Sequence, residues 1–429
     1  MRGIGLFVFL VMGASLCSAQ SKYENILIEE FNGTDRYQPC EPSIAISQTK
    51  PERIVAGSIL DKVYTSSDSG RTWTIDRLKS PLGVFGDPCI VASPKGGFFY
   101  FHLSNPDGEG WASDALLDRI VCQYSKNNGK SWSKGAGIGL DEGKDQDKEW
   151  AATSLDGKCV YATWTQFDAY DSKNAEDSTL ILFSMGNQRG EKWTAPTRIS
   201  KQAGNCLDGD ETVEGAVPCV GPKGEIYVSW ALGNTIWFDR SLDEGKTWLS
   251  EDIAAAEIVG GWDMKVHGIN RCNGMPVTAC DRSEGAHKGT IYINWADQRN
   301  GEDDTDIWLA SSSDGGDSWS EPVRVNNDEG KAQQFFTWMD IDQSNGRVYI
   351  VFYDRRNLEG NATNVYLAYS DDGGKTFTNE LISESTFTPS ESVFFGDYNN
   401  ISVKDGMVRP IWTRYEKGRL SIWTALINH

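Results

Sequence analysis

Carboxylate side chains recur at one kind of position in this chain, just before short apolar stretches that alternate like β-strands. Five such residues are Glu41, Asp87, Glu149, Glu214 and Asp397. Lys148, Trp150 and Tyr398 accompany two of them, and Gln334 and Trp338 occupy the same kind of position in QQFFTW. Carboxyl groups gathered at one place can act as general acid and general base. The alternative is that they cap strand ends or bond neighbouring loops.

Arginine side chains follow three consecutive strand-like stretches in the last third of the chain. They are Arg299 in WADQR, Arg355 and Arg356 in FYDRR, and Arg414 in WTRY. Arginine holds a carboxylate or a sulfate through two parallel N–H bonds, so the cluster predicts an acidic ligand. The alternative is pairing within each turn, with Asp297 and Asp354 as partners. Arg355 and Arg356 cannot both face the ligand if the chain is extended there.

The sequence gives little sign of a metal or a cofactor. Asp303, Asp304 and Asp306 lie close together in EDDTD and could bind a structural calcium ion with the help of backbone carbonyls. A solvated acidic loop is the other interpretation of these residues. No pair of cysteines has the C-x-x-C spacing of a zinc site, and we expect no cofactor.

An octet of the form S-x-D-x-G-x-[ST]-W recurs along the chain and predicts where strands turn. Clear copies occupy residues 66–73, 241–248, 312–319 and 370–377, a copy with Asn127 occupies 125–132, and a degenerate copy lies at 184–193. The Asp or Asn oxygen can accept nearby backbone N–H groups, and the glycine permits a left-handed backbone. The closing aromatic ring can be buried against the sheet. The octet is therefore interpreted as a hairpin that shapes the fold and performs no chemistry.

A second repeat supplies the strands themselves. It has the form Gly-x-apolar-Tyr-apolar-x-Trp and is clearest at residues 157–164, 224–230, 289–295 and 346–352. Its alternation of apolar and polar residues is typical of a β-strand, and a short apolar strand and a turn precede it. The full unit is strand, turn, strand, variable loop, strand, octet and strand, recurring about every sixty residues. Residues 112–118 are the only expected short helix.

Four strands per unit around a closed ring predict an all-β fold, a β-propeller. Second strands end near Ser58, His102, Trp164, Trp230, Trp295, Phe352 and Trp412, which favours seven blades over six. The last unit lacks an octet, and residues 23–30 could supply its outer strand and close the ring.

The two faces of such a ring have different contents. The octet hairpins lie on one face, whereas inner strands begin and second strands end on the other. The carboxylates and the arginines are therefore expected around one central mouth, on the face opposite the octets.

The first residues have the pattern of a secretory signal. Arg2 precedes an apolar run at residues 4–16, and a small-residue cleavage site ends near Ala19. The run is too short to span a membrane comfortably, and no later stretch is long enough. We expect residues 1–19 to be a signal peptide and residues 20–429 a single propeller domain, secreted or periplasmic and monomeric. The net charge of −20 argues against nucleic acid as a partner.

Eight cysteines follow the expected cleavage site. An even number of cysteines in an exported chain predicts disulfide bonds. The short loops favour Cys206 with Cys219 and Cys272 with Cys280.

The octets resemble the Asp boxes, or BNR repeats, of the sialidase superfamily, and the resemblance covers essentially the whole mature chain. It implies a propeller with the boxes on the face opposite the functional one. Sialidases use a tyrosine nucleophile paired with a glutamate, an aspartate as acid and base, and three arginines around the substrate carboxylate. The Arg-Ile-Pro that usually carries the first of these arginines is absent here.

The order of residues along the chain fits the sialidase order in part. By this resemblance Tyr398 attacks the anomeric carbon, Glu214 takes its proton and Asp87 protonates the leaving oxygen. An unassisted tyrosine, with a pKa near 10, is a poor nucleophile, so the paired glutamate is essential. The residues implied for binding an acidic sugar are Arg299, Arg355, Arg356, Arg414, Glu149, Trp338 and Asp397.

Three functions stay open at this point. The first is an exported glycoside hydrolase that resembles exo-sialidases and acts on an acidic oligosaccharide or polysaccharide. The second is a lyase or dehydratase for uronic-acid oligosaccharides of a polysaccharide such as ulvan, with a Tyr or His267 taking the proton next to the carboxylate. The third is a non-catalytic propeller that binds glycans or proteins.

Overall fold

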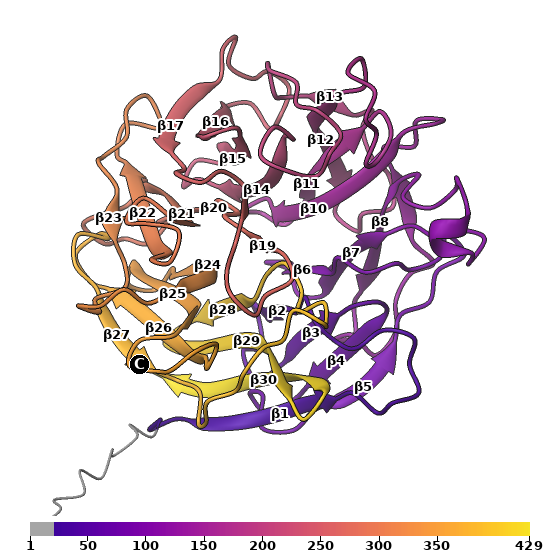
Figure 1. Ribbon diagram of the computed structural model, residues 1–429. Helices are drawn as coiled ribbons and strands as arrows, with labels where there is room; N and C mark the ends of the chain where they lie inside the picture. Colours follow the sequence, from indigo (N-terminus) through magenta and orange to yellow (C-terminus); the bar gives the residue numbers. More distant parts are fainter. Residues whose placement is uncertain (1–20) are drawn as a thin grey trace, which may run out of the picture.

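The computed structural model describes residues 21–429 and shows seven four-stranded sheets arranged in a ring around a central axis (Figure 1). Every neighbouring pair of strands within a sheet is antiparallel, so each sheet is one blade of a β-propeller. The expected fold and the count of seven blades are confirmed, and six blades are excluded. The signal peptide expected at residues 1–19 lies outside the described residues.

The first four blades follow one another along the chain, each from its inner strand outward. Blade 1 comprises β2 (Ser43–Ile46), β3 (Ile54–Ser58), β4 (Lys62–Ser66) and β5 (Thr74–Arg77). Blade 2 comprises β6 (Cys89–Ala92), β7 (Phe98–Leu103), β8 (Ile120–Ser125) and β9 (Ala136–Ile138). Blade 3 comprises β10 (Asp145–Thr153), β11 (Cys159–Phe167), β12 (Thr179–Asn187) and β13 (Thr197–Arg198). Blade 4 comprises β14 (Glu214–Val220), β15 (Ile226–Leu232), β16 (Thr235–Ser241) and β17 (Ile253–Glu257).

A small two-stranded hairpin, β18 (Asp263–Met264) and β19 (Cys272–Asn273), precedes the last three blades. Blade 5 comprises β20 (Val277–Cys280), β21 (Ile291–Asp297), β22 (Asp306–Ser312) and β23 (Val323–Arg324). Blade 6 comprises β24 (Gln334–Asp342), β25 (Arg347–Asp354), β26 (Asn364–Ser370) and β27 (Thr378–Leu381). Blade 7 comprises β28 (Asn400–Lys404), β29 (Met407–Glu416), β30 (Arg419–Asn428) and β1 (Glu24–Glu30).

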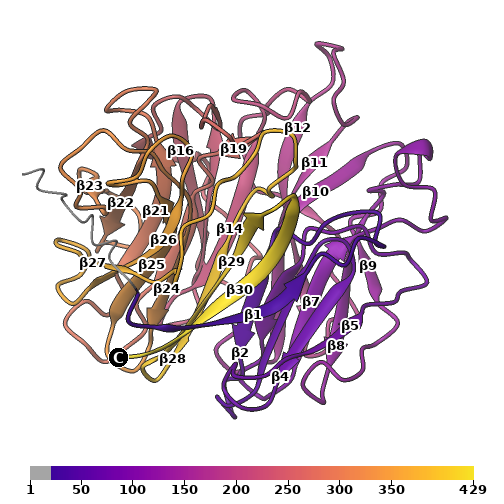
Figure 2. The same ribbon diagram turned by 60° about the horizontal axis from the view of Figure 1, so that its bottom comes forward.

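The ring is closed by the first strand of the chain. Strand β1 pairs antiparallel with β30, from Glu24 opposite Leu426 to Glu30 opposite Ser421, and the two lie side by side in both views (Figures 1 and 2). The outer strand expected from residues 23–30 is thus present. Because β1 and β28–β30 come from opposite ends of the chain, blade 7 holds the two ends of the propeller together and leaves no open seam.

Large aromatic side chains of the second strands fill the spaces between blades. The indole rings of Trp164, Trp230, Trp295 and Trp412 are fully buried. Each occupies the same place in its blade, near the middle or end of the second strand, so the Gly-x-apolar-Tyr-apolar-x-Trp repeat is the packing unit of the ring. Burying rings of this size supplies much of the apolar area that a sheet protein needs.

Every clear octet joins the third strand of a blade to the fourth, as expected. In residues 66–73, Ser66 Oγ donates to Asp68 at 2.8 Å, and Asp68 accepts from Thr72 N at 2.9 Å and from Thr72 Oγ1 at 2.6 Å. Gly70, at a φ of 88°, donates to Ser66 Oγ, and Trp73 Nε1 donates to Gly70 O. The Ser and backbone N–H bonds to the aspartate recur around Asp243, Asp314 and Asp372.

One expectation about local structure is corrected. The short helix expected at residues 112–118 is a single 3₁₀ turn at Gly110–Ala112 followed by turns. Within residues 21–429 no helix is long and apolar enough to cross a membrane.

The expected disulfide bonds are absent, since all eight cysteines of residues 21–429 carry free thiols. Cys272 belongs to β19, whereas Cys280 is the last residue of the inner strand β20. Eight residues of mostly extended chain span about 25 Å at 3.3 Å per residue, far beyond the reach of a disulfide. Cys206 bridges to Ser172 in a blade 3 loop, whereas Cys219 lies on β14 beside the axial channel.

Candidate active site at the central mouth

The start of the inner strands breaks the regular alternation of side chains. In five blades the residue two positions before the regular ladder has a left-handed backbone, with φ of 53° at Glu41, 48° at Asp87, 53° at Lys148, 77° at Gly215 and 46° at Phe336. Bulges accompany these positions in blades 3, 4 and 6. A left-handed residue or a bulge changes the direction in which the neighbouring side chains point. The polar residues at the starts of these strands therefore gather at the mouth on the face opposite the octets.

Asp397 is the centre of the mouth's charge network. Arg271 donates to it from Nε at 2.9 Å and also from Nη2, and Lys148 Nζ lies 2.9 Å from Oδ2. Lys148 also lies 3.4 Å from Asp87. Burial alone would raise the pKa of the Asp397 carboxyl, but the charges of Arg271 and Lys148 hold it well below its usual range. Asp397 is therefore an ionised anchor, fully buried between two cations.

A second carboxyl pair, Asp208 and Glu214, lies beside this anchor. Arg271 Nη1 donates to Asp208 at 2.5 Å, and the Tyr170 hydroxyl donates to the same oxygen. Burial, followed by the charge of Asp208, raises the pKa of Glu214 well above its usual value. Within residues 21–429 neither oxygen of Glu214 has a hydrogen-bond partner, so no hydrogen bond stabilises its ionised form, and burial favours the protonated carboxyl. Protonated Glu214 therefore lies near a second carboxyl group, that of Asp208.

Burial raises the pKa of three further carboxyl groups at the mouth. Burial, with the charge of Asp87, raises the pKa of Glu41 and Glu149 well above the usual range. Burial raises the pKa of Asp147 to about 7, against the opposing charge of Lys148. Asp87 is the partly exposed carboxylate of this group. The mouth thus holds acids in both protonation states at neutral pH.

Aromatic rings form the floor of the mouth. The ring centroids of Trp150 and Trp338 lie 4.3 Å apart, and Tyr398 meets Trp150 edge-on at 4.9 Å. Tyr398 is only 3% exposed, and its hydroxyl donates to Pro88 O at 3.5 Å. Both tryptophans also line a cavity of 260 Å³ along the axis of the ring. The three rings therefore separate the mouth from the channel beneath it.

The structure brings together six of the residues singled out from the sequence: Asp87, Glu149, Glu214, Trp338, Asp397 and Tyr398. It does not form the expected bond between Tyr398 and Glu214. Within residues 21–429 the Tyr398 hydroxyl bonds only Pro88 O, while Glu214 faces Asp208.

The arginines of the second strands are placed apart from this cluster. Arg299 Nε donates to Asp297 at 2.9 Å, and its guanidinium lies 4.3 Å from the ring centre of Trp308. Arg414 bonds Glu416 at 3.0 Å and lies over Trp423. Arg414 is thus held by residues of its own blade, and Arg299 by its own blade and by Glu257 O of blade 4, to which its Nη2 donates at 2.9 Å.

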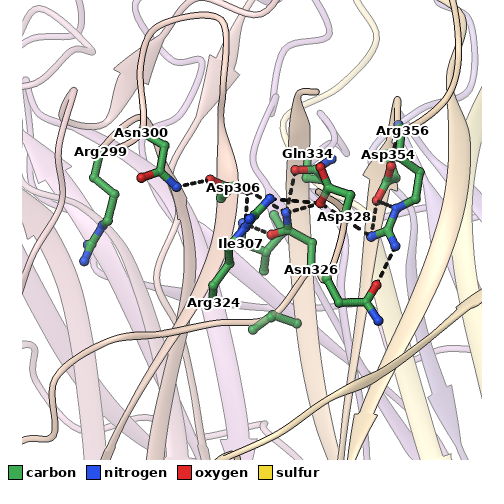
Figure 3. A network of polar contacts seen from close by, with 12 residues as sticks. Arg299, Asn300, Asp306, Ile307, Arg324, Asn326, Asp328, Gln334, Asp354 and Arg356 are labelled. Atoms are coloured by element: carbon green, nitrogen blue, oxygen red, sulfur yellow. Dashed lines mark hydrogen bonds and ion pairs between the residues drawn. The ribbon is translucent and has the colours of Figure 1, made fainter. Parts of the chain in front are cut away.

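Arg356 belongs to a polar network between blades 5 and 6 (Figure 3). Its Nε donates to Asp354 at 2.8 Å, and Asn326 joins Asp306 to Asp328 in the same network. The bond between Arg356 and Asp354 is the pairing within one turn that was expected as the alternative to ligand binding. Arg356 therefore stabilises the contact between two blades.

Arg355 and His267 line a different cavity, of 740 Å³, on the rim between blades 5 and 6. His267 is exposed and pairs with Asp303 at 3.2 Å. Neither residue is bonded to the carboxyl cluster of the mouth.

A pocket of 460 Å³ on the blade 2 side of the rim carries an exposed tryptophan, Trp111. Its side chain is 61% exposed, and its ring lies 5.6 Å from Tyr170 and 5.9 Å from Phe85. Tyr170 is the residue that bonds Asp208, so the pocket adjoins the acid pair. An exposed indole face held in place by two rings is suited to stacking on a sugar ring.

The sequence did not reveal Asp208, Arg271 or Tyr170, because they lie in loops outside both repeats. Arg271 is carried by the segment between β18 and β19, which reaches over the centre of the ring (Figures 1 and 2). The only signal was the irregular length of the chain between blades 4 and 5. Asp147 could have been found, since it directly precedes Lys148 and Glu149.

The acidic loop of residues 303–306 does not converge on one point. Asp306 is bonded by Arg324 at 2.7 Å and by Asn326, whereas Asp303 faces His267. In the described part of the chain no group of three or more His, Cys, Asp or Glu side chains is arranged to hold a metal. Structural calcium stays an untested prediction.

Comparison with known proteins identifies the fold and no family. No family model matches the chain, and no curated protein matches it in sequence. Among solved structures, an ulvan lyase bound to GlcA(1-4)Rha3S is similar at 12% identity, with a TM-score of 0.54 over 93% of this chain and 96% of that one. A protein of unknown function from Dyadobacter fermentans gives 12% identity and 0.52, over 95% and 98%.

The NanB sialidase from Streptococcus pneumoniae is similar at 9% identity, with a TM-score of 0.51 over 87% of this chain and 83% of the sialidase. Such low identities show a shared propeller fold. The chemistry of the mouth must be argued from its own residues.

Proposed function

We propose that the protein is an exported carbohydrate-active enzyme that hydrolyses a glycosidic bond at the central mouth. The observation that carries the proposal is the buried Glu214 carboxyl at the mouth, whose pKa is raised well above its usual value by burial and by the charge of nearby Asp208. Carboxyl groups held in different protonation states are what glycoside hydrolysis requires. The sialidase and the lyase that share the fold act on glycans by their names, which supports the substrate class.

The proposed reaction assigns one role to each of three residues. Glu214 gives its proton to the leaving glycosidic oxygen as the bond to the anomeric carbon breaks. Asp87, partly exposed and 3.4 Å from the Lys148 ammonium, takes a proton from the water whose oxygen bonds the anomeric carbon. Tyr398 is given no nucleophilic role, because its hydroxyl faces a backbone carbonyl and no carboxylate bonds it within residues 21–429.

Arg271 is proposed to bind the acidic group of the substrate. Its side chain is 31% exposed at the mouth. A guanidinium has more N–H donors than the three bonds to Asp397 and Asp208 use. Trp111 at the rim would hold a neighbouring sugar ring by stacking.

A second reaction is favoured by the contact of Tyr170 and Arg271 with the same oxygen of Asp208. In a β-elimination Arg271 would neutralise a uronate carboxylate, and Tyr170 would take the adjacent carbon-bound proton as its own moves to Asp208. The bond between the neighbouring carbon and the glycosidic oxygen then breaks, this oxygen takes up a proton from water, and a double bond forms between the two carbons.

A panel of sialosides and of ulvan and alginate oligosaccharides tests the proposal with two readouts. New reducing ends without ultraviolet absorbance support hydrolysis, whereas new absorbance from an unsaturated sugar supports elimination. Binding of a panel member without any product would support the non-catalytic alternative. Neither product nor binding with any acidic glycan would contradict the assignment of the mouth.

A further inference from the structure

The Arg355 guanidinium is buried without a counter-ion. The residue is 5% exposed, and its Nη1 and Nε donate to the neutral oxygens of Gln333 at 2.7 Å and Thr363 at 3.1 Å. Its Nη2 has no hydrogen-bond partner anywhere in residues 21–429. No carboxylate of the described chain forms an ion pair with it, whereas Arg356 beside it is paired with Asp354.

Burying an unpaired guanidinium destabilises the folded protein unless a ligand supplies the missing partner. A buried charge needs a partner, and an unpaired charge in a buried place is strongly destabilising. Burial lowers the pKa of Arg355 to about 10, which leaves the group charged at neutral pH. The face of the guanidinium rests 4.9 Å from the ring centre of Phe335, so the side chain is held in one orientation.

Arg355 is one of the residues that line the rim cavity of 740 Å³, so the cavity adjoins the buried, unpartnered group. Lys331, Arg356 and His267 also line it, and its acidic residues are engaged or exposed. Asp328 is bonded by Arg324 at 3.0 Å and by Asn326 at 2.7 Å, Asp303 pairs with His267, and Glu329 points to solvent. No lining carboxylate competes for Arg355.

We propose that this rim cavity is an oxyanion site in which Arg355 binds a carboxylate or a sulfate through its free Nη2 and a neighbouring N–H. The planar fork of a guanidinium matches two oxygens of either group. The site shares no lining residue with the carboxyl cluster of the mouth, nor with Arg299 or Arg414. It is therefore a separate site and does not require catalysis at the mouth.

Calorimetric titration with inorganic sulfate, against chloride at matched ionic strength, tests the site. The wild-type protein is expected to bind sulfate saturably, and Arg355→Met to bind it at least tenfold more weakly. Arg71→Met, which removes an exposed arginine of the octet face, is the control and keeps wild-type binding. Equal binding by Arg355→Met and the wild type would overturn the proposal, as would no sulfate binding by the wild type.

Two further arms identify the source of the anion and protect the test from a misfolded variant. Glucuronate or glucose 6-sulfate that binds tenfold more tightly than sulfate assigns the site to a glycan, whereas weaker binding assigns it to a free anion. Wild-type crystals soaked in selenate are expected to show an anomalous peak beside Arg355 Nη2. A well-ordered soak without that peak would contradict the site whatever the variant does.

Discussion

Arg271 Nε donates a hydrogen bond to Oδ1 of Asp397 at 2.9 Å and thereby ties the β18–β19 segment to the start of blade 7. Asn273 strengthens the tie by donating to the backbone carbonyl of Asp397 at 2.9 Å. The segment that crosses the mouth is thus fastened to the opposite side of the ring. Both the position of the mouth's exposed cation and the ionised state of its central carboxylate depend on this contact.

Replacing Arg271 by alanine is expected to lower the free energy of unfolding by about 3 kcal/mol, because Asp397 would stay buried with Lys148 as its only cation. Urea unfolding measures the change. Arg71→Ala is the control, since its pair with Glu24 is exposed, and it should cost under about 1 kcal/mol. Similar losses in the two variants would show that the mouth pair is no more than a surface contact.

Asp147 makes the stability of the mouth dependent on pH. Burial raises its pKa to about 7, whereas in the unfolded chain an aspartate titrates near 4. Between these values the folded state binds more protons than the unfolded state, so this group's contribution to stability falls as the pH rises from about 4 to about 7.

Asp147→Asn should remove that part of the slope when unfolding is followed between pH 4.5 and 7.5. Lys148, Asp87 and Asp208 are the charged groups that face it and they stay in place. Parallel curves for variant and wild type would show that Asp147 titrates normally.

The octet aspartates should have the opposite effect on how stability depends on pH. Hydrogen bonds from the Thr247 hydroxyl and N–H lower the pKa of Asp243 to about 2. Its contribution is present above the unfolded value near 4 and is lost as the pH falls toward 2. Asp243→Asn should keep the turn, as Asn127 does naturally, and flatten this acid limb. Catalysis on the opposite face should be unchanged, and a large loss of activity in a folded variant would argue against the assignment of the two faces.

Trp111→Ala is expected to raise KM for an oligosaccharide about tenfold with little change in kcat, because an exposed aromatic anchor contributes binding and no chemistry. The free energy of unfolding should change by under about 0.5 kcal/mol, as for other exposed positions. Leu242→Ala, an exposed apolar residue in an octet, is the matched control. An unchanged KM would remove the rim pocket from the substrate path.

Most of the fold could be predicted because its repeats are local. The octet of residues 66–73 makes its bonds within eight residues, and the strand pattern around Trp230 repeats what its own blade needs. Even the closure of blade 7 by β1 followed from one missing strand. A fold can be predicted from its sequence when the local interactions of each segment agree with the overall structure.

Only part of the site could be predicted, because some of its residues lie in loops outside the repeats. Glu214 and Asp397 occupy repeated positions at the starts of inner strands, so they could be found. Asp208 and Arg271 approach through loops whose course no repeat determines, and their partners are 63 and 126 residues away in sequence. Arg299 was expected to bind a ligand, but its guanidinium is bonded by Asp297, two residues earlier in the chain.

The central claim is that the protonated carboxyl of Glu214 donates the proton in glycan cleavage. It is tested most directly by the turnover of Glu214→Gln on a glycan that the wild-type enzyme cleaves. Glutamine keeps the shape and the buried position but has no acidic proton, so kcat should fall by about 10²–10⁴-fold while the protein stays folded. Turnover by folded Glu214→Gln at the wild-type rate would contradict the account.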